Sequence, residues 1–126
     1  MPDIIATGHA YAAAVNALDP EAFASLFTAD AELHDPVGAP PRLGPSGARA
    51  FMEQFLPLLH SVHLRAGEIH VNGHNAAFTW ALEATGKNGS TAAAHGIDVF
   101  ECNAEGRIAR TRGYWDPAPF VSALMR

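Results

Sequence analysis

The chain has little of three things that would point to particular classes of protein. Lysine and arginine number 8 against 13 aspartates and glutamates, for a net charge of −5, and they form no cluster, which argues against nucleic acid as a main partner. The single cysteine, Cys102, excludes an internal disulfide and favours a reducing, cytoplasmic location. We interpret it as an inert core thiol rather than a nucleophile. No apolar run is long enough to predict a membrane span.

What the sequence does contain indicates a compact folded protein. Its 126 residues are 48% hydrophobic and 17% charged, which is typical of globular chains rather than disordered ones. No internal repeat or low-complexity linker divides it. We therefore expect residues 1–126 to form one domain around one substantial core.

The first half of the sequence predicts helices. Apolar residues recur at helical spacing over 4–18, and an Asp-Pro start followed by apolar residues predicts a second, short helix over 19–27. A Gly-Pro-Ser start predicts a third helix over 44–59. Residues 31–35 between them predict a short strand, and the prolines of 36–41 predict a loop because proline defeats both helix and ladder.

The second half predicts strands separated by turns. We expect strands over 63–71, 76–84, 91–101 and 107–115, followed by a short C-terminal helix after Asp116. Helices followed by an antiparallel meander indicate an α+β fold. The sheet must curl around the helices to bury one face of each.

The most informative residue is Asp98, which lies in a predicted strand with no lysine or arginine nearby in the sequence. Alternation puts it on the same face as Gly96 and Phe100, so the carboxyl group is expected to lose hydration. Loss of hydration penalises the charged form and raises the pKa, which makes the group a hydrogen-bond donor at neutral pH. The alternative is an aspartate at a sheet edge or facing solvent.

Two further residues supply complementary groups. Tyr11 lies on the apolar stripe of the first helix, where its hydroxyl needs a partner. Asp35 precedes Pro36 at the end of the short strand. Considered singly, Tyr11 is more often a core tyrosine and Asp35 a turn-forming aspartate. Together with Asp98 they offer a phenol donor, a carboxylic-acid donor and a carboxylate base.

The last predicted strand leaves room for a ligand. Ala109, Thr111 and Gly113 share one face with Trp115, and their small side chains on the concave side of a curved sheet favour an apolar pocket. The alternative is tight packing of helix on sheet without a void.

The chain resembles a known family in several stretches. The matching residues are Tyr11, the run 27–41 with its loop Asp35-Pro36-Val37-Gly38-Ala39-Pro40-Pro41, Ile97-Asp98-Val99, Glu105-Gly106-Arg107-Ile108 and Tyr114-Trp115. In these residues and their spacing the sequence resembles the ketosteroid isomerases, a steroid Δ5-isomerase group within the NTF2-like (SnoaL-like) proteins. The resemblance covers nearly the whole chain.

The resemblance implies a fold, a reaction and an assembly. The fold is a cystatin-like cone, with a curved antiparallel sheet wrapped around three N-terminal helices and a short C-terminal helix. The reaction moves the double bond of a 3-oxo-Δ5-steroid into conjugation, with Asp35 as the base and with Tyr11 and protonated Asp98 as donors to the oxyanion. It needs no metal or organic cofactor, and the family assembles as a homodimer through the outer face of the sheet.

Comparison with the family also shows two positions where this sequence differs from some relatives, and it indicates which residues could form a hydrophobic wall around a small apolar ligand. Phe27 and Met52 occupy positions where some relatives carry tyrosines linked to the catalytic tyrosine, so Tyr11 is expected to lack those hydrogen bonds. The residues expected to form the hydrophobic wall are Phe51, Met52, Phe55, Val62, Phe78, Phe100 and Trp115.

Other functions remain open at this point. The chain has seven histidines, but the pairs His60/His63 and His70/His74 lack the helical context of a zinc motif, so no metal site is expected. Alternation sends His34 to the face opposite Asp35. A polyketide-cyclase-like enzyme or other lyase, a non-catalytic binder of small apolar ligands and a dimerisation module are the alternatives that the fold also permits.

Overall fold

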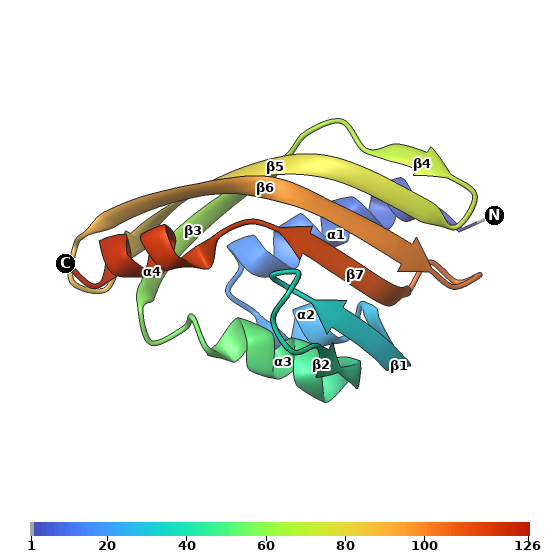
Figure 1. Ribbon diagram of the computed structural model, residues 1–126, viewed down its shortest axis with the longest axis horizontal. Helices are drawn as coiled ribbons and strands as arrows, with labels where there is room; N and C mark the ends of the chain where they lie inside the picture. The colour runs from blue at the N-terminus through green and yellow to red at the C-terminus, as the bar shows by residue number, and fades with distance from the viewer. Residues whose placement is uncertain (1) are drawn as a thin grey trace.

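The computed structural model describes residues 2–126, which form helices at both ends of the chain around a large curved sheet (Figure 1). The helices are α1 (Ile4–Asn16), α2 (Pro20–Ala24), α3 (Gly44–Glu53) and α4 (Pro117–Leu124). The strands are β1 (Phe27–His34), β2 (Arg42–Leu43), β3 (Leu59–Ala66), β4 (His70–Asn72), β5 (Asn75–Gly86), β6 (Thr91–Cys102) and β7 (Ile108–Tyr114).

The sheet is mixed, which corrects the expectation of an antiparallel one. The strand order is β2-β1-β7-β6-β5-β3, with β4 also paired to β5. All of these pairings are antiparallel except that of β1 with β7, which is parallel. The exception arises because β1 comes from the helical half of the sequence, so its partner is the distant last strand rather than a hairpin neighbour.

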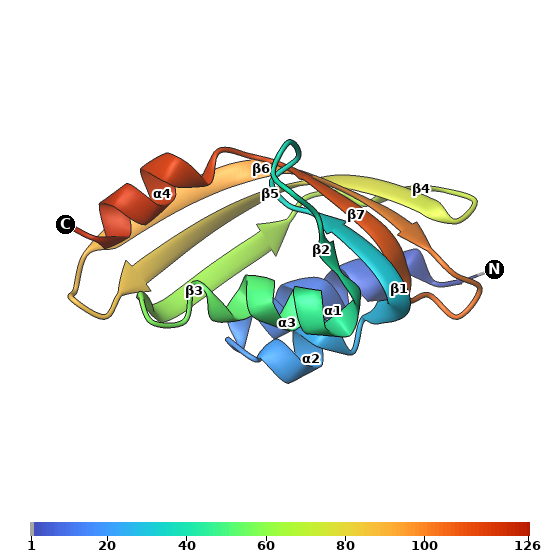
Figure 2. The ribbon, with the colours of Figure 1, turned by 60° about the horizontal axis from the view of Figure 1, so that its bottom comes forward.

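The α+β class predicted from the sequence is confirmed, and the sheet curves over the N-terminal helices (Figure 2). Aspartates cap three of the four helices: Asp3 accepts from the amide of Ala6, Asp19 from those of Glu21 and Ala22, and Asp116 from that of Ala118. Two of those caps precede a proline in the first turn, as the Asp-Pro pairs predicted.

Several boundaries differ from the sequence prediction. α3 ends at Glu53 rather than at residue 59, and β3 begins at Leu59 rather than at residue 63. β1 begins at Phe27 rather than at residue 31. The strand expected over 63–71 is two strands, β3 and β4, because the chain leaves the ladder at Gly67. The amide of Gly67 donates to the Thr79 carbonyl over 2.7 Å, and a β-carbon there would lie 2.6 Å from Thr79 Oγ1, so this close approach requires glycine.

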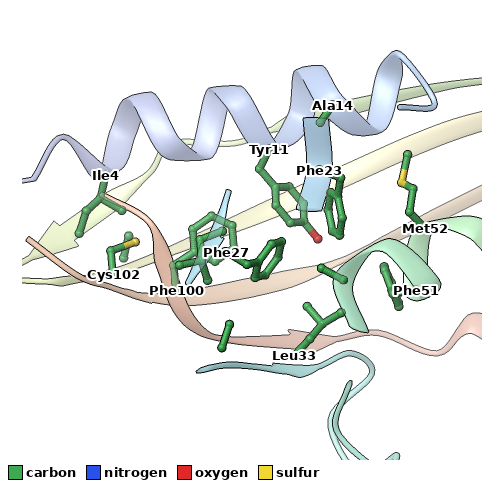
Figure 3. Close-up of a cluster of buried hydrophobic side chains, with 14 of the residues drawn as sticks. Ile4, Tyr11, Ala14, Phe23, Phe27, Leu33, Phe51, Met52, Phe100 and Cys102 are labelled. Carbon is green, nitrogen blue, oxygen red and sulfur yellow. The ribbon is translucent and has the colours of Figure 1, made fainter. Parts of the chain in front are cut away.

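The core lies between the concave face of the sheet and helices α1–α3. Its centre is a group of aromatic rings around Tyr11 and Phe23 (Figure 3). A second cluster lies where α4 covers the other end of the sheet. Burial raises the pKa of the Cys102 thiol to about 11, so this cysteine stays protonated at neutral pH, as expected of a core thiol. Within residues 2–126, no helix is long and apolar enough to cross a bilayer.

Candidate active site

An apolar pocket opens between the sheet and the N-terminal helices. It encloses about 590 Å³ of empty space, including solvent at its mouth. Its lining residues are Tyr11, Val15, Leu18, Asp35, Phe51, Met52, Phe55, Leu59, Val62, Leu64, Trp80, Leu82, Trp115 and Phe120. Asp35 is the only charged side chain among them, so a ligand in this pocket meets one carboxyl group in an otherwise apolar wall.

Asp35 reaches the pocket because of the parallel pairing of β1 with β7. Just after β1 ends, the amide of Val37 donates to the Gly113 carbonyl over 2.8 Å, which holds the segment across β7. The carboxyl group lies directly over Gly113, where a β-carbon would come within 2.6 Å of Asp35 Oδ1. The indole N–H of Trp115 donates to that same oxygen over 2.6 Å.

Asp98 lies beside Asp35 on the inner face of β6. It pairs with Gly113 in the β6–β7 ladder, which brings it next to the carboxyl group that covers that glycine. Its side chain is only 2% exposed. Asp98 is not among the residues that line the pocket, so it lies directly behind the wall.

Tyr11 approaches the two acids from α1. It lies on the buried face of that helix and is 4% exposed. The rings of Phe23 and Phe100 pack against it with centroid distances of 5.1 and 5.2 Å, and Figure 3 shows its hydroxyl pointing towards the α3 side of the core. These contacts hold the phenol in place while its oxygen remains at the pocket.

The electrostatics of the site follow from burial without a cation. Loss of hydration raises the pKa of Asp35 to about 6, against the opposing effect of the Trp115 hydrogen bond. Burial raises the pKa of Asp98 well above its usual value, as does the charge of Asp35, while donors from Trp80 and Tyr11 act in the opposite direction. Burial, reinforced by the two carboxylates and a hydrogen bond with Asp98, raises the pKa of Tyr11 above its ordinary range.

The three groups therefore divide by protonation state into one ionised carboxylate and two neutral groups. At neutral pH Asp35 is mostly ionised, whereas Asp98 and Tyr11 keep their protons. A carboxylate beside a neutral acid and a phenol is able to accept a proton from a bound molecule while the other two stabilise developing negative charge. Sequence reasoning selected all three residues, and the fold brings them together.

Most of the residues expected to form the hydrophobic wall do line the pocket. These are Phe51, Met52, Phe55, Val62 and Trp115. Phe78 and Phe100 do not. They lie deeper, because Phe100 packs on Tyr11 and Phe78 packs on Phe100 with a centroid distance of 5.2 Å. The sequence analysis correctly placed both side chains on the inner faces of β5 and β6. Tyr11 lies between them and the pocket.

The two positions where some ketosteroid isomerases carry tyrosine hold apolar side chains that also have apolar surroundings in the structure. Phe27 is buried against Phe23, and Met52 lines the pocket. Neither side chain donates a hydrogen bond to the Tyr11 hydroxyl.

The sequence analysis did not expect seven of the residues that line the pocket, nor the glycine beneath Asp35. The seven are Val15, Leu18, Leu59, Leu64, Trp80, Leu82 and Phe120. Trp80 lines the pocket, and the alternation of Phe78, Trp80 and Leu82 on β5 was the available signal. Gly113 carries the Asp35 carboxyl group, and the small-residue face of the last strand indicated only empty space there.

The histidines lie away from this site. His34 is on the opposite face of β1, where it lies 3.0 Å from Glu32, as strand alternation predicted. His60, His63, His70 and His74 are exposed. Over the part of the chain that the structure describes, no group of three or more histidine, cysteine or acidic side chains is arranged to hold a metal ion.

A second, wider hollow adjoins the pocket on the side of the proline loop. It shares Asp35, Phe51, Phe55 and Trp115 with the pocket and is otherwise lined mainly by residues of 36–42 and the start of α4. Asp35 therefore lies where the enclosed pocket meets the outside, which gives a ligand a route to the carboxyl group.

The fold and the sequence both match known proteins. Residues 9–111 match the SnoaL-like domain. The chain is 33% identical over 114 residues to a steroid Delta-isomerase of Nocardioides simplex, covering 88% of each protein. It superimposes with a TM-score of 0.80 and 26% identity on SalBIII, an epoxide hydrolase/cyclase-like enzyme with a role in pyran ring formation in the polyether salinomycin, covering 92% of each chain.

A further solved structure agrees in fold alone. RV0760c from Mycobacterium tuberculosis has a TM-score of 0.80 at 19% identity, over 94% of this chain and 96% of that one. The homologues thus include a steroid isomerase and a cyclase-like enzyme. The chain belongs to the SnoaL-like family of NTF2-like proteins.

Proposed function

We propose that the protein is a steroid Δ5-isomerase that moves the double bond of a 3-oxo-Δ5-steroid into conjugation with the ketone. The observation that carries this proposal is that an ionised carboxyl group and a phenol line an apolar pocket, with a neutral carboxyl group next to them directly behind its wall. The 33% identity to a steroid Delta-isomerase supports it.

The reaction begins with proton removal by Asp35. A β,γ-unsaturated ketone has an acidic C–H between its carbonyl group and its alkene, and the Asp35 carboxylate takes that proton. The C–H electron pair moves into the carbon framework to give a dienolate, with the negative charge on the former ketone oxygen. A pKa of about 6 leaves Asp35 ionised at neutral pH and basic enough for the task.

The second half of the reaction returns the same proton. Protonated Asp35 delivers it two carbons along, which leaves the conjugated enone and regenerates the carboxylate. No atom is gained or lost and no redox change occurs. The Trp115 hydrogen bond occupies Asp35 Oδ1, so Oδ2 is the oxygen that carries the proton between the two carbons.

Tyr11 and Asp98 act on the oxygen of the dienolate. Both keep their protons at neutral pH, so both are donors when negative charge develops there. One well-placed donor of this kind typically lowers the barrier by about 2.7–4 kcal/mol. The steroid skeleton occupies the apolar part of the pocket, between Val15 of α1, Phe55 and Trp115.

A cyclase-like activity is the second candidate, because SalBIII matches at 26% identity. Cyclisation also uses a pocket acid and base, but it does not require two neutral donors that converge on one oxygen. A binder of apolar ligands does not require a carboxylate that is ionised inside an apolar wall. The pairing of Asp35 with Asp98 therefore favours the isomerase.

The test is turnover of a 3-oxo-Δ5-steroid, followed by the ultraviolet absorbance of the enone product. The Asp35→Asn variant should lose at least about 10²–10⁴ in rate, because it loses the positioned base. Equal rates in the two proteins would remove Asp35 from the mechanism. Tight binding of a phenolic steroid without turnover of any Δ5 substrate would favour the binder.

We also propose a homodimer through the outer face of the sheet. Ile97 and Tyr114 pair across β6 and β7 and are 44% and 47% exposed, which places two large apolar side chains together on that face. Sedimentation at micromolar concentration should give twice the mass of the chain. Substituting both residues with serine should give the monomer, and a wild-type monomer would reject the proposal.

A further inference from the structure

Three buried side-chain polar atoms of residues 2–126 lack a hydrogen-bond partner, and one of them is the hydroxyl oxygen of Thr111. The other two are the indole nitrogen of Trp80 and the Oδ1 atom of Asp98, in the core next to the pocket, on side chains that are 7% and 2% exposed. Leaving either atom unpaired in the core costs free energy. One is a donor and the other is an acceptor.

The two side chains are neighbours on the inner face of the sheet. In the β5–β6 ladder Trp80 pairs with Gly96, and Asp98 is two residues further along β6 on the same face. Such diagonal neighbours are within reach of an aromatic side chain. A β-carbon at Gly96 would lie 2.8 Å from Trp80 Cζ2, so the glycine lets the indole lie across β6 next to Asp98.

We propose that Trp80 is a positioning residue for Asp98, that its indole N–H donates to Asp98 Oδ1, and that this contact fixes the carboxyl proton on Oδ2. The inference rests on the proposed function for its catalytic meaning. An indole nitrogen only donates, so the oxygen that faces it must be the acceptor. The proton is thereby left on the other oxygen, where it is available to the ketone.

Each of the two acids then has its own tryptophan. Trp115 donates to Oδ1 of Asp35, and on this proposal Trp80, which acts on the pKa of Asp98 as a donor, faces Oδ1 of Asp98. The two rings pack edge to face with a centroid distance of 5.4 Å.

The titratable groups that face Asp98 are few. They are Asp35 from the end of β1 and Tyr11 from α1, and neither carries a positive charge. Within residues 2–126, no cation contributes to the pKa of Asp98. The Trp80 donor opposes the burial of the carboxylate and so works to lower that pKa.

The sequence makes the hydrogen bonds directly observable, because the chain has only two tryptophans. In the ¹⁵N-labelled protein, Asp98→Asn should move the Trp80 indole N–H signal strongly and the Trp115 signal little. Asp35→Asn should do the reverse. The Trp115→Phe variant assigns the two signals, since only that of Trp80 remains.

This crossed experiment needs no turnover, so it separates the present inference from the isomerase proposal. A Trp80 signal that stays in place in Asp98→Asn would overturn the inference, as would equal movement of both indoles in both variants. It also needs no change at Trp80, so instability of a Trp80 variant does not weaken it.

Kinetics supply the second test if the Δ5-steroid is turned over. The Trp80→Phe variant removes the donor and should lower kcat on the order of tenfold, less than the 10²–10³ typical of a lost oxyanion donor. Its KM should change little. The basic limb of its pH profile should move to higher pH, because a donor that stabilises the Asp98 carboxylate is gone. An unmoved basic limb, or a loss confined to KM, would contradict the positioning role.

Discussion

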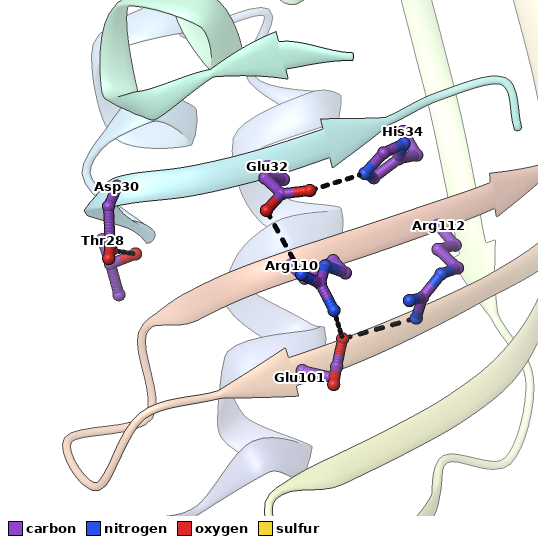
Figure 4. Close-up of polar contacts among 7 residues, drawn as sticks. All are labelled: Thr28, Asp30, Glu32, His34, Glu101, Arg110 and Arg112. Atoms are coloured by element: carbon purple, nitrogen blue, oxygen red, sulfur yellow. Dashed lines mark hydrogen bonds and ion pairs between the residues drawn. The ribbon is translucent and has the colours of Figure 1, made fainter.

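Acidic side chains on the two faces of β1, β6 and β7 lie in opposite electrostatic environments. On the outer face, Arg110 Nη2 lies 3.2 Å from Glu32 and its Nη1 lies 3.3 Å from Glu101, which Arg112 also contacts at 3.3 Å (Figure 4). Hydrogen bonds from His34 and Arg110 hold the pKa of Glu32 below its usual value. Both carboxylates are partly solvated and paired with arginine.

On the inner face, half-buried Asp35 and buried Asp98 lie near each other, and within residues 2–126 no cation contributes to the pKa of either. Their pKa values are raised, to about 6 for Asp35 and well above its usual value for Asp98. Val99 and Glu101 point outwards while Asp98 points inwards, so a single step along β6 separates the two environments. The direction of a carboxyl group across the sheet therefore decides between a solvated ion pair and a desolvated acid with a raised pKa.

Among the variants that keep Asp35, replacing Asp98 should give the largest effect, and it tests whether the proposed reaction uses donation from the inner face. Asp98→Ala removes a donor to the oxyanion and should lower the isomerase rate by about 10²–10³. Asp98→Asn is the matched control, because its amide still donates, and should retain most of the activity. Equal losses in both variants would show that donation from position 98 is not what the reaction uses.

Moving the base without removing it should give the next largest effect. In Gly113→Ala the new methyl group would come within 2.6 Å of Asp35 Cγ and Oδ1, so the carboxyl group must shift. A displacement of about 1 Å in a catalytic group can cost on the order of 10² in rate. The measured rate should fall by that order while circular dichroism remains unchanged, and full activity would place the working oxygen of Asp35 elsewhere.

The pH dependence of kcat/KM should report the protonation of Asp35 on the inner face of the sheet. Protonation of Asp35 removes the base, so kcat/KM should fall about tenfold per pH unit below the pKa of about 6. The Trp115→Phe variant lacks the hydrogen bond that lowers this pKa, and its acidic limb should move to higher pH. Glu32→Gln on the outer face should leave the acidic limb of the profile unchanged. A shift of that limb in Glu32→Gln would show that the two faces are not electrostatically independent.

Stability should respond to pH in opposite directions on the two faces. The folded state raises the pKa of Asp35 from 3.8 to about 6, so this residue contributes least to stability above pH 6. Asp35→Asn should therefore raise the free energy of unfolding at pH 8 by up to about 3 kcal/mol, with the gain lost as the pH falls through 6 to below 4.

The outer face provides the control for that measurement. Glu32 has a lowered pKa, so its charged form stabilises the fold at neutral pH and this contribution is lost as the pH falls through its folded pKa. Glu32→Gln should lower stability at pH 8, with a difference that vanishes in acid. Urea titrations across this range measure both variants, and equal signs for the two would contradict the comparison.

Local patterns in the sequence predicted a large part of this structure. The Asp-Pro starts of α2 and α4, the alternation of β6 that turns Asp98 inwards and the loop over 36–41 depend on neighbouring residues alone. The family resemblance selected Tyr11, Asp35 and Asp98 as a group. All three lie within one region of the fold.

The features that the sequence did not predict depend on distant partners. The parallel pairing of β1 with β7 could not be predicted from local sequence, because no pattern within residues 27–34 indicates that the last strand is its partner. The same holds for Gly113, whose role is to make room for a carboxyl group from elsewhere. Phe78 and Phe100 were assigned to the correct face but to the wrong depth, since depth depends on what α1 places in front of them.

The pairing of β1 with β7 also sets when the protein becomes able to act. Asp35 and its partner Trp115 are separated by 80 positions, and the glycine beneath the carboxyl group comes from the final strand to be synthesised. A chain still emerging from the ribosome therefore contains Asp35 before it contains Gly113 and Trp115, the residues that position its carboxyl group. In the proposed isomerase, turnover requires this long-range pairing, so refolding followed by enzyme assay should lag behind refolding followed by helix content.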